Sequence, residues 1–206
     1  MSATKPPEGL LSSTDLPESL RAHTIGDLLN LHLPPLLRPY IRATLQHHLA
    51  TLRGPAGFLL DSAGKELRYD PDNLPPPPRG PGIQLCFKSL PHHNQRANTP
   101  VTVDNTDQLA LLYCREFVRT KRLTIDTADS SSLLNMLARA SCFPSPVRVK
   151  AARVRDEVRN LWAHGDHNIW TRDVFITCLN ILVELVIHIP NHEMVSKRIN
   201  NLKKKS

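Results

Sequence analysis

The chain has 206 residues, of which 40% are hydrophobic and only 5% aromatic, and it carries a formal net charge of +7. This length and apolar content argue against a wholly disordered chain and suffice for one folded domain with a Leu-, Val-, Ile- and Ala-rich core. No apolar run reaches the roughly 18–20 residues of a membrane span, and no signal-peptide pattern is present, so we expect no membrane contact. Four cysteines without a C-x-x-C pair favour a reducing, intracellular location, cytoplasmic or nuclear.

The first half of the chain is rich in proline and glycine. Residues 1–15 are expected to be a disordered tail, and a single domain is expected over 16–204. Its opening helices are predicted within 20–52, where apolar residues recur at helical spacing in 36–52 and a shorter helix precedes them at about 24–32. Residues 53–105 contain the run Pro75–Pro78 and two glycine–proline clusters, which predicts a proline-rich irregular insertion. Short strands are expected within that insertion, at 57–60 and 83–87.

Residues 106–204 are predicted to form the main helices. Fifteen of the eighteen prolines lie in the first 100 residues, and such scarcity of breakers afterwards predicts an all-α fold. Five helices are expected, at about 107–122, 130–142, 145–165, 171–189 and 191–202. Asp129 or Ser130 can cap the second, Ser145 and Pro146 suit the start of the third, and Gly165 suits a left-handed end.

The predicted helix at 171–189 is apolar nearly all round, apart from one narrow polar stripe. A helix with this pattern is the central member of a bundle, or its exposed side meets another subunit.

One short motif near the end of the 145–165 helix combines groups that suit phosphate chemistry. It reads RNLWAH, with Arg159, the polar Asn160 directly after it, and His164 five residues beyond the arginine. Histidine titrates near neutrality and can accept a proton, whereas the planar guanidinium fork of arginine matches a phosphate. These three are therefore the candidate catalytic residues.

This R-x4-H motif resembles that of the HEPN superfamily. The segments DNTDQLALLYCREF and SSSLLNMLARASCF look like the preceding helices, and GDLLNLHLPPLLRPYIRATL like the opening helices, of one HEPN branch. That branch is found in the DAZ-interacting zinc-finger ubiquitin ligase and related uncharacterised animal proteins. The resemblance covers about residues 20–200 in pieces and implies a HEPN-like helical bundle that carries the proline-rich insertion.

The resemblance also implies a function. HEPN nucleases cleave RNA without a metal ion or cofactor, by attack of the ribose 2′-hydroxyl on the adjacent phosphate. His164 would then be the acid–base group, Arg159 would hold the phosphate, and Asn160 would orient the histidine or the phosphate. The implied partner is RNA, contacted nonspecifically by the basic residues of 148–155 and 197–205, which can equally be solvated.

Helix geometry constrains how Arg159 and His164 act together. At about 100° per residue, the two lie about 140° apart around an ideal α-helix. We therefore expect the helix to unwind at Gly165, or a second chain to complete the site. The second arrangement predicts a homodimer, the form that the superfamily commonly adopts.

Other interpretations stay open. Arg159 can be an ordinary helix residue that pairs with Asp156, and the helix dipole alone favours a histidine before a terminal glycine. The bundle can also be a noncatalytic module that dimerises or docks a protein partner, or one that binds a nucleotide without turnover. The loop HGDH at 164–167 offers two histidines and a carboxylate, but no further ligand at a recognised zinc spacing, so we expect no metal.

Overall fold

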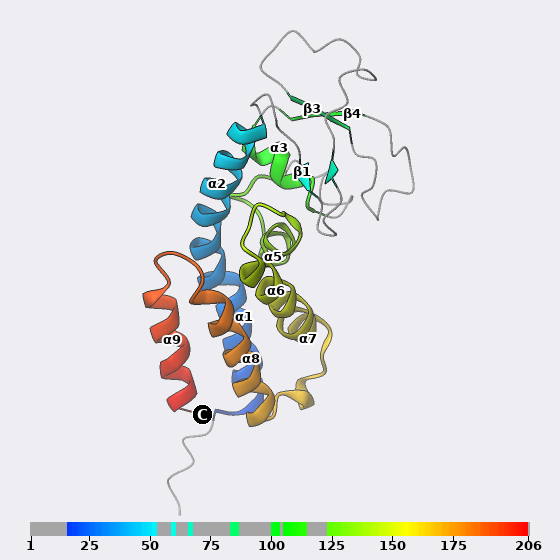
Figure 1. Ribbon diagram of the computed structural model, residues 1–206. Helices are drawn as coiled ribbons and strands as arrows, with labels where there is room; N and C mark the ends of the chain where they lie inside the picture. The colour runs from blue at the N-terminus through cyan, green and yellow to red at the C-terminus, as the bar shows by residue number, and fades with distance from the viewer. Residues whose placement is uncertain are drawn as a thin grey trace, which may run out of the picture.

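The computed structural model describes residues 16–52, 59–60, 66–67, 83–86, 100–103, 105–114 and 123–205. These residues form an all-α bundle with two short antiparallel two-stranded ribbons beside it (Figure 1). The predicted all-α fold is therefore confirmed. The expected disordered tail lies outside the described residues, and so does most of the expected insertion at 53–105.

The first helical segment is continuous over α1 (Glu18–Asp27), a π-helical stretch η1 (Leu28–His32) and α2 (Leu33–Leu52). The prediction of separate helices at 24–32 and 36–52 is therefore wrong. In η1 the Leu33 N–H reaches back five residues to the Leu28 carbonyl. Pro34 and Pro35 follow and have no N–H to donate, so a wider turn at this point keeps the helix continuous past them.

The strands form two ribbons. β1 (Leu59–Leu60) pairs with β2 (Glu66–Leu67), and β3 (Ile83–Cys86) pairs with β4 (Pro100–Val103) in antiparallel register. β1 and β3 lie within the ranges 57–60 and 83–87 predicted for strands, and residues 57, 58 and 87 lie outside the described residues. Val103 is fully buried in the helical core, which attaches the β3–β4 ribbon to the bundle.

Two short helices follow. α3 (Thr106–Leu111) begins after Asn105, whose side chain caps it, and the chain turns at 112–114, so the helix is shorter than predicted. The rest of that prediction, 115–122, lies outside the described residues. α5 (Ser130–Arg139) begins at the expected cap, since the Asp129 Oδ1 accepts the Ser132 N–H at 2.8 Å. It ends before the predicted Cys142 because the backbone of Ala140 is extended.

The third helix consists of α6 (Ser145–Arg153), a π-helical stretch η2 (Val154–Arg159) and α7 (Asn160–His164). Pro144 precedes the helix and Ser145 makes no capping hydrogen bond, so the expected Ser145 cap is wrong. Gly165 ends the helix as expected, but its φ of −77° is not left-handed. Glycine suits this position because a Cβ would collide with the Leu161 carbonyl and the Ile169 side chain.

The apolar helix is the centre of the bundle. A 3-10 turn η3 (His167–Ile169) leads into α8 (Arg172–Val186), which packs against α1, α6, η2 and the last helix, α9 (Glu193–Lys204). The polar stripe of α8, which includes Asp173 and Thr177, lies at or near the surface, while its apolar side is covered within the chain. The central-helix alternative is therefore correct. Among the described helices, none has both the length and the hydropathy that crossing a membrane requires.

Candidate functional site

A polar cavity of about 480 Å³ lies between α5 and the segment formed by η2 and α7. Its volume falls in the roughly 300–1,000 Å³ range of small-molecule sites. The residues that line it are Cys114, Asp129, Ser131, Ser132, Asn135, Arg139, Arg155, Asp156, Arg159, Asn160 and His164. All three candidate catalytic residues therefore contribute to one cavity within a single chain.

Arg159 presents its guanidinium to this cavity. The side chain is partly exposed, and its Nη1 donates a hydrogen bond of 3.3 Å to the Oδ1 of Asn160. The alternative ion pair with Asp156 does not form, because that carboxylate binds Arg155. Within the described part of the chain, no carboxylate lies within 4 Å of the Arg159 guanidinium. The group is therefore a cation with several N–H donors available to a ligand.

Arg155 differs from Arg159 because a carboxylate already neutralises its charge. Its Nε and Nη2 donate to the two carboxylate oxygens of Asp156, both at 2.8 Å, and this pairing raises the pKa of the guanidinium. Its Nη1 donates to the Oδ1 of Asn135 at 3.1 Å. The Asn135 side chain is buried and donates in turn to the Ser131 carbonyl at 2.9 Å. Arg155 thus joins the two walls of the cavity.

His164 is the last residue of α7 and is exposed on the solvent side of the cavity. No hydrogen bond to another described residue fixes its imidazole ring. The ring is therefore accessible both to the cavity and to solvent.

The single chain brings Arg159 and His164 to one cavity, and the helix ends at Gly165 as expected, with both residues still inside it. The separation of about 140° applies to an ideal α-helix, whereas the helix just before Asn160 is π-helical, with the Asn160 N–H bonded to the Arg155 carbonyl. The side chain of Arg159 is also long, so its guanidinium lies well away from the Cα position that this angle describes. A second chain is therefore not needed to bring the two residues to the same cavity.

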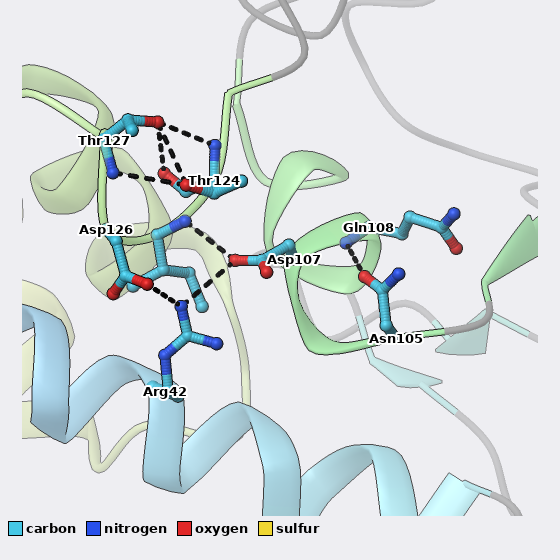
Figure 2. A network of polar contacts seen from close by, with 8 residues as sticks. Arg42, Asn105, Asp107, Gln108, Thr124, Asp126 and Thr127 are labelled. Carbon is cyan, nitrogen blue, oxygen red and sulfur yellow. Dashed lines mark hydrogen bonds and ion pairs between the residues drawn. The ribbon is translucent and has the colours of Figure 1, made fainter.

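A polar network holds the turn that leads into α5 (Figure 2). Arg42 of α2 forms ion pairs with Asp126 at 2.9 Å and with Asp107 at 3.5 Å. Asp107 also accepts the Ile125 N–H at 2.8 Å. Three segments, α2, α3 and the 124–127 turn, are tied together in this way.

Arg38 extends this network toward the cavity. Its Nη2 donates to the Ala128 carbonyl at 3.0 Å, one residue before Asp129. Because Asp129 lines the cavity and caps α5, the arginines of α2 determine where the α5 wall of the cavity lies.

The basic residues expected at 148–155 are largely paired with acids. Lys150 and Arg153 both bind Glu184 of α8, and Arg153 also binds Glu157 at 3.0 Å. The hydrogen bond from Lys150, helped by the charge of Arg153, lowers the pKa of Glu184. These cations stabilise the packing of α6 and η2 on α8. The basic tail on α9 lies on the far side of α8 from α7 in the view of Figure 1.

A second cavity, of about 610 Å³, is mainly apolar. It lies between the η1–α2 segment and the start of α9, with Leu31, Pro35, Tyr40 and Met194 among its lining residues. Leu31 is 62% exposed and Met194 is 82% exposed. This groove offers mainly apolar contact area, with His32 and Tyr40 as titratable side chains in its lining. Among the described side chains, no cluster of three or more His, Cys, Asp or Glu residues is placed to hold a metal ion.

Comparison of the chain with protein-family models, curated proteins and solved structures gives no match.

The sequence singles out Arg159, Asn160 and His164 and includes Arg155 among the basic residues of 148–155, but it does not single out Asn135. The one available signal was Asn135 itself, a polar residue inside the apolar run LLNMLA. A buried asparagine requires a hydrogen-bond partner, but the sequence does not say which one.

Proposed function

We propose that the chain is a HEPN-like RNA-binding protein that cleaves RNA without a metal ion, using Arg159, Asn160 and His164. The observation that carries the proposal is that one polar cavity contains all three residues of the R-x4-H motif. The guanidinium of Arg159, which no carboxylate of the described residues binds, and the exposed imidazole of His164 are the two groups that this chemistry requires.

Arg159 would bind the scissile phosphate. Its guanidinium donates to the non-bridging oxygens and stabilises the negative charge that develops on them in the transition state. Asn160 accepts one N–H of Arg159, so it would orient the guanidinium plane and leave the other donors for the phosphate. Asn160 is therefore a positioning residue in this proposal.

His164 would act as the general base. Its neutral imidazole accepts the proton of the ribose 2′-hydroxyl as O2′ forms a bond to phosphorus. The bond from phosphorus to O5′ breaks, the departing O5′ takes up a proton from solvent water, and the protonated His164 returns its proton to the solvent. The products are a 2′,3′-cyclic phosphate and a 5′-hydroxyl. Because the nucleophile is the 2′-hydroxyl, the reaction is restricted to RNA.

The test is RNA cleavage in EDTA. The full chain and the variants Arg159→Ala and His164→Ala are incubated with mixed single-stranded RNA. His188→Ala is the matched control, since His188 is also exposed but lies after α8, outside the cavity. We expect cleavage by the wild type and the control and loss of cleavage in the two cavity variants. Equal background in all four samples would remove the proposal.

A second candidate function is noncatalytic dimerisation, favoured by the exposed Leu31 and Met194 beside the apolar groove. The proposed partner is a second copy of the chain. Sedimentation at micromolar concentration then gives a dimer that Met194→Glu weakens and His164→Ala does not. A monomer of 23.1 kDa at every concentration contradicts this candidate.

A further inference from the structure

The charged side chains that line the polar cavity come from both of its walls. The α5 wall contributes Asp129 at the start of the helix and Arg139 at its end, and η2 contributes Arg159 together with Arg155 and Asp156, which bind each other. Arg159 and His164 contribute a cation and a proton acceptor from η2 and α7. Asp129 contributes a carboxylate from the start of α5. Its Oδ1 accepts the Ser132 N–H at 2.8 Å, and the side chain is exposed. No cationic group of the described residues lies within 4 Å of this carboxylate, so it keeps acceptor capacity for a ligand.

The opposite charges of Arg159 and Asp129 orient a bound nucleotide. If the cavity holds RNA as proposed above, the phosphate lies at Arg159, because the Asp129 carboxylate would repel it. The base of the same nucleotide then extends toward the start of α5. A carboxylate at that end can only accept hydrogen bonds, so it favours a base edge that presents donors.

The four bases differ in the hydrogen-bond donors that their edges present. Guanine presents two adjacent donors, N1–H and the N2 amino group, which match the two oxygens of one carboxylate. Adenine and cytosine each present one amino group beside a ring acceptor, and uracil presents one N–H between two carbonyl oxygens. The hydroxyls of Ser131 and Ser132, which also line the cavity, can donate to the guanine O6.

We infer that the cavity selects guanine nucleotides and that Asp129 is the residue that recognises the base. The inference rests on the proposed function, since it takes the phosphate to bind at Arg159. It adds a specificity that the R-x4-H motif itself does not contain.

The test is calorimetric titration of the full chain with the 5′-monophosphates of guanosine, adenosine, cytidine and uridine at one salt concentration. We expect the guanosine nucleotide to bind most tightly. In Asp129→Asn that affinity falls roughly tenfold, as for the loss of a two-point contact to a base, and the uridine nucleotide is not weakened. Asparagine caps helices as well as aspartate does, so the variant keeps the start of α5. Asp173→Asn, an exposed aspartate of α8 outside the cavity, is the control.

The outcomes separate this inference from the proposed function. Equal binding of all four nucleotides that disappears in Arg159→Ala overturns the guanine preference and leaves the RNA site in place. A guanosine preference that persists in Asp129→Asn overturns the role of Asp129. Failure of the wild type to bind any of the four, together with no RNA cleavage, overturns both.

Discussion

The Nη1 of Arg155 donates a hydrogen bond of 3.1 Å to the carboxamide oxygen of Asn135, and this bond joins η2 to α5 between two residues that line the polar cavity. Asn135 is only 8% exposed and is also bonded to the Ser131 carbonyl. The bond fixes the two walls of the cavity relative to each other. Asn135 therefore acts on the site through its geometry, without a role in proton transfer.

Replacing Asn135 is expected to destabilise the fold. In Asn135→Ala, the Arg155 Nη1 loses its acceptor in a partly buried place, which lowers the free energy of unfolding by about 1–3 kcal/mol. Urea denaturation measures the loss. The control is Asn180→Ala on the exposed stripe of α8, which should change stability by less than about 0.5 kcal/mol. Equal effects of the two substitutions would show that the Arg155 bond contributes little.

The network of Figure 2 predicts a difference between two substitutions of Asp107. Asp107→Ala removes both the acceptor of the Ile125 N–H and the ion pair with Arg42, with an expected loss of about 1–3 kcal/mol. Asp107→Asn keeps an acceptor for the N–H and loses only the partly exposed ion pair, which is worth about 0–1 kcal/mol. Chemical denaturation of both variants tests this order. The reverse order would mean that the charge contributes more than the hydrogen bond.

Gly26 of α1 lies against the indole of Trp162 on α7. A Cβ at Gly26 would come within 2.6 Å of the Trp162 Nε1. Gly26→Ala is therefore expected to lower the free energy of unfolding by about 1–3 kcal/mol through overpacking. In the background of Trp162→Ala, the same substitution should be nearly neutral, and a double-mutant cycle measures the difference. Additive effects would contradict this close contact.

The protonation of His48 is expected to make the free energy of unfolding depend on pH. Burial, with a smaller contribution from the neighbouring His47, holds the pKa of His48 below its ordinary value of 6.5. Below pH 6.5, His48 binds a proton more readily in the unfolded chain than in the folded one. The free energy of unfolding therefore falls as the pH drops from 6.5 through the pKa of His48 in the folded protein. In His48→Gln this part of the dependence should disappear, as measured by urea denaturation at several pH values. A pH dependence that is the same in His48→Gln as in the wild type would contradict the assignment.

A mixing experiment tests whether one chain contains the whole site. If Arg159 and His164 act from the same chain, an equimolar mixture of Arg159→Ala and His164→Ala has no more activity than either variant. A site shared between two chains would instead recover activity in mixed dimers. Recovery in the mixture, measured as RNA cleavage, would contradict the single-chain site.

Local signals in the sequence predicted part of this structure well. Asp129 caps α5 as expected, because a cap depends on residues only a few positions apart. The apolar pattern of α8 predicted its central place, and the R-x4-H spacing predicted three residues of one cavity.

The remaining features depend on packing, which local patterns do not contain. Arg155 and Asn135 are twenty residues apart, and their bond exists only because α5 packs on η2. The two π-helical stretches widen one turn each, which barely changes the spacing of apolar residues. The sequence predicts a left-handed helix end at Gly165. In the structure, the absence of a side chain at Gly165 instead allows the Ile169 side chain to pack closely against it.

The central claim is that Arg159 and His164 act on one RNA phosphate in the polar cavity. The most direct measurement uses DNA oligonucleotides that each contain a single internal ribonucleotide, with each of the four bases in turn, incubated in EDTA and analysed by mass spectrometry. The predicted result is cleavage only after the ribonucleotide, a fragment ending in a 2′,3′-cyclic phosphate, and no cleavage by Arg159→Ala or His164→Ala. Intact oligonucleotides with the wild-type protein, or cleavage that persists in both variants, would contradict the claim.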